Sequence, residues 1–289
     1  MQVQTEPEAR RRVRELVQRT KATAGLQKAP RYLGVKDPIA DCLGILVKEE
    51  VLPLCDEGQY IPDDPPIIVL DPRIGDPDRL NFTFFHEISH HLICRDDKLY
   101  SFLHEYTAAS DKHFDAALEH YCNIGAAEFL IPAEEVCKVI EEQGFSIRLV
   151  EHLEPIYPAS KPAIAIQLAQ CAIHQCFVVV CEWGQMPQQQ MPQVSFLSPM
   201  DSRPQLYVLY ASSSPSARYS IGRFVTVPSD HVIALAYQSQ STVKDTAPIL
   251  FRSGNREWKC ECEAFYYKGK VYAAFNASPP TSPKQLRLL

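Results

Sequence analysis

Five consecutive residues, His86-Glu87-Ile88-Ser89-His90, bring together two metal-binding side chains and a carboxylate that can act as a base. On a helix, His86 and His90 lie one turn apart on one face, about 6 Å along the axis, and two imidazoles at that spacing can hold one Zn²⁺. Glu87 then lies beside the ion, where it can accept a proton from water. The motif predicts a metal-dependent hydrolytic site with His86 and His90 as ligands and Glu87 as the catalytic residue.

The flanking sequence predicts that this motif lies on a buried helix. No proline or glycine occurs from Arg79 to Leu99, and Asp78 is a candidate N-cap. Apolar side chains continue the helical spacing around the motif: Leu80, Phe82, Phe84, Phe85, Ile88, Leu92 and Ile93. The alternative is a pair of histidines on an ordinary helix, with no metal bound.

A hydrolytic zinc site needs a third protein ligand and keeps one position open for water. Glu119 is the candidate, since it opens a second stretch with apolar residues at helical spacing that runs to Leu130. A carboxylate at the head of an apolar face is costly to bury without a positive partner, and zinc would supply that charge. The small Ala126 and Ala127 would let the two helices approach closely, whereas Glu128 is an alternative ligand.

Cys94 follows His90 by four positions and is open to two interpretations. As a thiolate it could bind the metal and inhibit the site until water displaces it. Helical rise places its backbone about 6 Å beyond His90, which is a long reach. The other interpretation is a small buried apolar side chain.

A β-branched run precedes the motif helix and is bounded by turn residues, which predicts a strand. Its residues are Ile67, Ile68, Val69 and Leu70. As the edge strand of a sheet, this run would pair with an extended substrate by β-augmentation. We therefore expect it to line the substrate cleft.

These segments resemble the ImmA/IrrE family of metallopeptidases. The resemblance rests on the His86 to His90 motif, on Glu119-His120-Tyr121-Cys122-Asn123, which is similar to the family's Glu-x-x-x-Asn, and on Ala126-Ala127-Glu128-Phe129-Leu130-Ile131-Pro132, which is similar to its Ala-Ala-x-x-Leu-x-Pro. It implies a zincin-like peptidase domain in which His86, His90 and Glu119 bind the metal and Glu87 is the catalytic acid and base. Zn²⁺ is the expected cofactor, and Mn²⁺ can share such ligands.

Beyond the peptidase, short segments in the same order resemble the IrrE (PprI) type of the family, in which a helix-turn-helix-like segment and a GAF-like domain follow. These segments are Ala211-Ser212-Ser213, Arg218-Tyr219-Ser220, Val227-Pro228, Asp230-His231 and Phe251-Arg252-Ser253-Gly254. The implied fold is α+β, with a zincin-like peptidase domain over residues 1–132, a helix-turn-helix-like segment over 133–175 and a GAF-like antiparallel sheet domain over 176–289.

The resemblance implies a zinc-dependent endopeptidase that cleaves an XRE-family transcriptional repressor and so derepresses DNA-damage, stress or defence genes. Its activity would be controlled through the GAF-like domain, with single-stranded DNA or a small molecule as activator. The alternatives are a DNA-binding transcription regulator and a ligand sensor with a structural metal site. Four polar residues of the helix-turn-helix-like segment could face DNA: Lys161, Gln167, Gln170 and His174. This set lacks the basic residues that phosphate contact requires.

Composition favours a protein of more than one packed unit. The chain has 289 residues, 46% of them hydrophobic, and is too long for one compact core of ordinary size. Its ten cysteines are dispersed without a CxxC pair, which predicts reduced thiols. No apolar stretch approaches the ~18 residues needed to span a bilayer, so we expect a cytoplasmic protein without a membrane partner. The net charge of −6 disfavours a general nucleic-acid-coating role.

The rest of the chain shows helical patterns before residue 175 and strand patterns after it. Further helices are expected over residues 9–23, 39–49, 133–140, 146–152 and 160–174. Strands are expected over 177–181, 206–211, 233–237, 264–267 and 271–275, with a Gln- and Pro-rich loop over 184–200. Arginines cluster on the first helix, where we expect a solvated face: Arg10, Arg11, Arg12 and Arg14.

Overall fold

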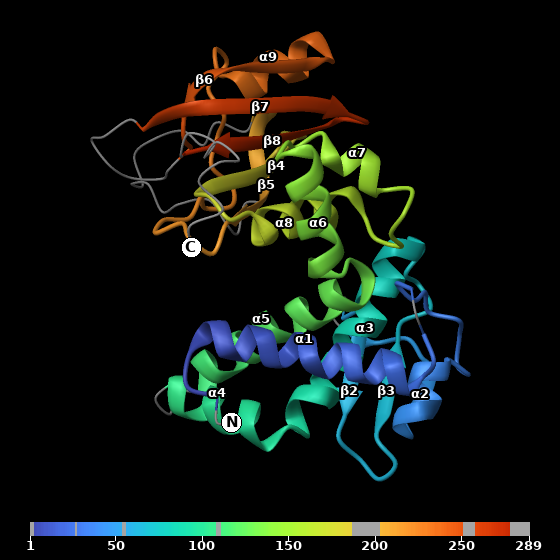
Figure 1. Cartoon of the computed structure of the whole chain (residues 1–289). Coiled ribbons are helices and arrows are strands. Elements are labelled where there is room, and N and C mark those ends of the chain that lie inside the picture. The colour runs from blue at the N-terminus through green and yellow to red at the C-terminus, as the bar shows by residue number, and fades with distance from the viewer. Residues whose placement is uncertain are drawn as a thin grey trace. The chain divides into compact units, whose positions relative to one another are not determined.

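The computed structural model describes residues 3–26, 28–53, 56–107, 111–186, 203–250 and 258–277. It divides into two compact units, and Figure 1 shows their elements. The first unit comprises Met1–Pro132 with Glu154–Ser160, and the second comprises Ala133–Leu153 with Lys161–Leu289. Each unit has its own helices and its own sheet, so the mixed α+β class is confirmed.

The elements of the first unit are α1 (Glu6–Thr23), α2 (Pro38–Leu43), β1 (Leu46–Glu49), β2 (Gly58–Ile61), β3 (Ile67–Leu70), α3 (Pro77–Cys94), α4 (Asp97–Tyr106) and α5 (Asp111–Leu130). The helix predicted across the His86 to His90 motif is α3. Its N-cap is Asp76, whose side chain accepts hydrogen bonds from the amides of Asp78 and Arg79, so the cap lies before the expected residue. No described helix combines the length and the apolar character needed to cross a bilayer.

Helices α3 and α5 approach each other closely along the motif. The rings of Phe85 and Phe129 stack with their centroids 4.9 Å apart. Next to them, a Cβ added to Gly125 would lie only 2.3 Å from Oγ of Ser89, so the absence of a side chain at Gly125 permits this approach. The two expected alanines belong to the same helix, and Ala126 is fully buried.

The small sheet of the first unit has the strand order β1-β3-β2. The predicted strand Ile67–Leu70 exists as β3, but the expectation that it forms the sheet edge is wrong. It pairs with β1 in parallel and with β2 in antiparallel orientation, so neither of its sides is free. A run that is apolar at every position is typical of a strand buried on both faces, and Ile68, Val69 and Leu70 are buried.

The helix expected over residues 39–49 is also only partly present. Helix α2 ends at Gly44, which adopts the left-handed conformation with φ +68° as a C-cap, and β1 follows. Glycine reaches this conformation without a steric cost and therefore ends helices often.

The elements of the second unit are α6 (Ala133–Gln143), α7 (Leu149–Leu153), α8 (Lys161–Cys171), β4 (Cys176–Gly184), β5 (Gln205–Ser213), α9 (Val232–Ser239), β6 (Thr242–Pro248), β7 (Lys259–Tyr267) and β8 (Lys270–Asn276). The sheet order is β5-β4-β8-β7-β6, and all neighbouring strands are antiparallel. The strand expected over 233–237 is instead α9, with His231 as its N-cap. Most of the expected Gln- and Pro-rich loop lies outside the described residues.

Helix α8, the last helix of the helix-turn-helix-like segment, packs on β4 and β5. Its polar side chains are engaged within the second unit. Nζ of Lys161 lies 4.2 Å from the ring centroid of Tyr267, and Nε2 of Gln170 donates to Oγ of Ser212 at 2.9 Å. Gln167 is buried, and His174, which follows the helix, lies 3.1 Å from Oδ1 of Asn276. These residues are therefore not presented to a DNA groove.

Candidate metal centre

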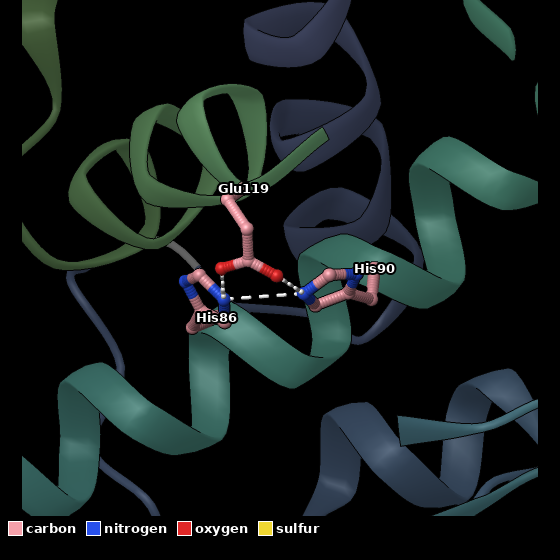
Figure 2. A group of neighbouring side chains, drawn as sticks. All are labelled: His86, His90 and Glu119. Atoms are coloured by element: carbon pink, nitrogen blue, oxygen red, sulfur yellow. Dashed lines mark hydrogen bonds and ion pairs between the residues drawn. The ribbon is translucent and has the colours of Figure 1, made fainter. Parts of the chain in front are cut away.

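Three side chains from α3 and α5 converge on one point (Figure 2). Nε2 of His86 lies 3.1 Å from one carboxylate oxygen of Glu119, and Nε2 of His90 lies 3.2 Å from the other. The two Nε2 atoms lie 3.1 Å apart. Tetrahedral zinc with bonds of about 2.0–2.1 Å requires ligand atoms about 3.3 Å apart, so this donor set fits such an ion.

Glu119 reaches the two imidazoles from the middle of α5 rather than from its start, because α5 begins at Asp111. Its side chain is 55% exposed, so the expectation of a buried carboxylate that requires a counter-charge is wrong. Its carboxylate nevertheless lies next to both imidazoles. Hydrogen bonds from His86 and His90 lower the pKa of Glu119, which keeps it ionised as a metal ligand must be.

Asn123 orients His86. Its Oδ1 lies 3.2 Å from Nδ1 of His86, and since an amide oxygen only accepts, Nδ1 carries the proton. Nε2 is then the ring atom directed at the candidate site, where a cation would take the place of the proton that Nε2 donates to Glu119. Asn123 is one helical turn after Glu119, so α5 supplies both a ligand and the partner of another ligand.

Glu87 lies on α3 between the two histidines and is 7% exposed. Burial raises its pKa above the ordinary glutamate value, while the nearby imidazoles and a hydrogen bond from the backbone amide of Tyr60 act in the opposite direction. The two carboxyl groups of the site therefore differ in their proton affinity. Glu119 is suited to binding a cation, and Glu87 is suited to accepting a proton.

Strand β2 packs closely against α3 beside Glu87. A Cβ added to Gly58 would lie 2.6 Å from Cγ2 of Thr83 and 2.9 Å from Oε1 of Glu87. The hydroxyl of Tyr60 lies 3.2 Å from Nδ1 of His91, a buried ring. No local pattern in the sequence marks Gly58 or Tyr60, and only the Glu-x-x-x-Asn spacing marks Asn123.

Two competing residues stay apart from the three converging side chains. Cys94 is the last residue of α3 and is not part of the group, and burial raises the pKa of its thiol, which favours the uncharged form. Glu128 is buried and faces α1, where it accepts a hydrogen bond from Nε2 of Gln18 at 2.7 Å. The structure thus brings together His86, His90 and Glu119, with Glu87 beside them.

The sequence around the candidate metal centre is similar to that of known proteins. Residues 40–168 match the sequence profile Peptidase M78, described as the IrrE N-terminal-like domain. Over these residues the chain is similar to the Peptidase M78 family. The match includes α3 and α5 and ends within α8.

Two known proteins are similar over most of the chain. The radiation response metalloprotease IrrE of Deinococcus radiodurans is 28% identical over 212 residues, which are 73% of this chain and 63% of that protein. The protein of the same name from Deinococcus deserti is 27% identical over 219 residues, which are 76% of this chain and 73% of its own length. The expected resemblance to IrrE proteins is confirmed.

A solved structure titled Mycobacterium tuberculosis transcriptional regulator has a similar fold. The TM-score is 0.58 at 13% identity, with 92% of this chain and 76% of that chain covered. At this identity the likeness concerns the fold alone.

Proposed function

We propose that this chain is a metal-dependent endopeptidase that binds Zn²⁺, or Mn²⁺ in its place, through His86, His90 and Glu119. The observation that carries the proposal is the convergence of these three ligands next to the buried carboxylate of Glu87. The family match and the metalloproteases among its relatives support it.

Each residue of the site has a defined task in this proposal. The bound ion supplies Lewis-acid chemistry that activates water near neutral pH. Glu87 accepts the proton of that water and passes it to the leaving amine, while the amide of Tyr60 holds its carboxylate in place. Asn123 keeps His86 in the tautomer that binds a cation. A carboxylate at position 119 reduces the positive charge of the ion by one unit.

We place the substrate on β2 instead of β3. The amide of Asp71 donates to the carbonyl of Glu57, so every second residue of β2 bonds to β3. The backbone groups of Gly58 and Tyr60 therefore face the other side, where the amide of Tyr60 bonds to Glu87. That side carries Glu87, the proposed base. An extended substrate segment pairing with this side of β2 would bring its peptide bonds to the metal site, so we propose cleavage within an extended loop.

The proposed substrate is an XRE-family repressor, cleaved to derepress DNA-damage, stress or defence genes in the cytoplasm. We also propose three parts in chain order. They are a zincin-like peptidase over residues 1–132, a helix-turn-helix-like segment over 133–175 and a GAF-like sensor over 176–289. Its support is the antiparallel sheet of the second unit, covered in part by α9 and α8. Single-stranded DNA or a small molecule is the proposed activator at this sheet domain.

The runner-up, a DNA-binding regulator, has less support. The polar residues of α8 contact the sheet of their own unit, and the clustered arginines of α1 have carboxylate partners. These ion pairs are Arg10–Glu6, Arg11–Glu15, Arg12–Asp96 and Arg14–Glu128. Neither helix offers a row of unpaired cations to phosphates.

A three-variant experiment tests the peptidase proposal. The purified chain is incubated with an XRE-family repressor and Zn²⁺ or Mn²⁺, and cleavage and bound metal are measured together. We expect Glu87→Gln to bind metal without cleaving, His86→Ala to lose both, and Glu105→Gln, an exposed carboxylate on α4, to behave as wild type. Cleavage by Glu87→Gln at the wild-type rate would refute the mechanism. Cleavage of unfolded peptides but not of the repressor would refute only the substrate.

A further inference from the structure

Helix α3 carries a stripe of polar side chains beside its metal ligands. The members recur at every fourth position and so lie along one ridge of the helix: Arg79, Thr83, Glu87 and His91. We call these four residues the polar stripe. Thr83, Glu87 and His91 are buried, and buried polar side chains destabilise a fold unless each has a hydrogen-bonding partner. The members of the stripe find partners on β2 or directly before it.

The first half of the polar stripe binds the residue that precedes β2. The carboxylate of Glu57 accepts hydrogen bonds from the guanidinium of Arg79 and from Oγ1 of Thr83, the second at 3.3 Å. The backbone carbonyl of Glu57 accepts from the amide of Asp71, directly after β3. Glu57 therefore joins α3 to the small sheet at one end of β2.

The second half of the polar stripe binds Tyr60 at two points. The backbone amide of Tyr60 donates to the carboxylate of Glu87, and its hydroxyl lies 3.2 Å from Nδ1 of His91. The rings of Tyr60 and His91 meet edge to face, with their centroids 5.6 Å apart. Glu87 and His91 are one helical turn apart, about 6 Å along the axis, and the side chain of Tyr60 spans that rise. Both the backbone and the side chain of Tyr60 are thus bonded to α3.

We propose that Tyr60 and His91 form a positioning pair for Glu87. This inference rests on the proposed function, in which Glu87 is the base. The backbone groups of Tyr60 face away from β3, so its amide depends on contacts with α3 for a fixed position. The bond between the Tyr60 hydroxyl and His91 supplies such a contact and keeps the amide on the Glu87 carboxylate.

The positioning pair acts on the base and not on the metal ligands. His86 and His90 point about 100° around the helix axis from Glu87 and His91. Loss of the Tyr60 hydroxyl would therefore release the orientation of the base while the two imidazoles keep theirs. A purely structural role for the polar stripe predicts the opposite, a loss of stability and of metal affinity together with activity.

Tyr60→Phe in the full chain tests the proposal, because it removes the hydroxyl and keeps the ring. In the metal-free protein we expect the amide of residue 60 to exchange with solvent about fivefold faster, the effect of about one net hydrogen bond. In the presence of Zn²⁺, kcat should fall by about tenfold. KM and the affinity for Zn²⁺ should stay within about twofold of the wild type.

Variants of His91 test whether the two residues act as a pair. His91→Leu should have the same effects as Tyr60→Phe, and the double variant should differ from either single variant by less than about twofold. His91→Asn keeps a hydrogen-bonding group near the place of Nδ1, so it should retain more of kcat than His91→Leu. If Tyr60→Phe does not fold, the comparison of these two His91 variants decides the proposal.

Tyr32→Phe is the matched control. The hydroxyl of Tyr32 also donates to a carboxylate, that of Glu49 at 3.4 Å, away from the polar stripe. This variant should leave the exchange of the residue 60 amide and kcat at their wild-type values. Unchanged exchange of that amide in Tyr60→Phe would overturn the inference, as would additive effects of Tyr60→Phe and His91→Leu. If the exchange results are as expected while the wild-type chain cleaves no substrate, only the proposed function fails.

Discussion

Gly125→Ala is expected to weaken metal binding more than it weakens the fold. The new Cβ would lie 2.8 Å from Cβ of Ser89 and 2.3 Å from its Oγ, against 3.4 Å or more in ordinary contacts. The hydroxyl of Ser89 can rotate, but its Cβ is fixed by α3, so α5 must move by a few tenths of an ångström or more. Metal–ligand distances tolerate only about 0.2 Å, and Glu119 lies on the helix that moves.

The opposing terms for stability nearly balance. Alanine stabilises a helix interior relative to glycine by about 1 kcal/mol, whereas overpacking costs about 1–3 kcal/mol. We therefore expect a folded variant, destabilised by about 0–2 kcal/mol, whose affinity for Zn²⁺ falls by about tenfold or more. The assay is a competition titration with a chromophoric chelator, alongside a thermal unfolding curve.

A second substitution provides the control for this reasoning. Ser89→Gly removes both atoms that meet the new methyl group, so the double variant Ser89→Gly with Gly125→Ala should recover most of the lost affinity. Ser89→Ala keeps the Cβ and should recover less. A folded Gly125→Ala variant that binds Zn²⁺ as tightly as the wild type would refute the view that this contact sets the position of Glu119.

Three further outcomes are expected. Asn123→Ala should lower the affinity for Zn²⁺ by about 10–100-fold with the fold retained, because His86 loses the acceptor that sets its tautomer, and a titration showing no change would contradict that role. Gly58→Ala should lower kcat by about 100-fold, because the new Cβ would lie 2.9 Å from Oε1 of Glu87 and displace that carboxylate. The metal content should stay at the wild-type level. Loss of metal would contradict the expectation that the substitution acts on Glu87. Burial raises the pKa of Glu87 above the ordinary value of 4.5, and the protonated carboxyl group cannot act as a base. We therefore expect kcat/KM to fall as the pH drops through a value above 4.5. A fall that begins only below pH 4.5 would count against Glu87 as the base.

Local patterns in the sequence predicted the helices that carry the site. The spacing of His86 and His90 specifies a shared helix face wherever that helix packs, because it depends only on the helical repeat. The same is true of α1 and of the apolar half of α5. Predictions failed where a single residue or a distant partner decided the outcome. Gly44 ended a helix that the apolar pattern would have continued. Residues 233–237 formed α9, capped by His231, because Ala234, Leu235 and Ala236 favour a helix more than Ile233 and Tyr237 favour a strand.

The sequence alone therefore determined the chemical character of this protein: two imidazoles one turn apart, a glutamate beside them and a second acidic helix that could complete a metal site. Only the tertiary structure decided how these parts meet. Glu119 reaches the histidines because Gly125 lets α5 approach Ser89, and β2 rather than β3 faces Glu87 because β3 bonds to strands on both of its sides. Contacts between segments far apart along the chain depend on packing and on strand pairing, which no local periodicity encodes.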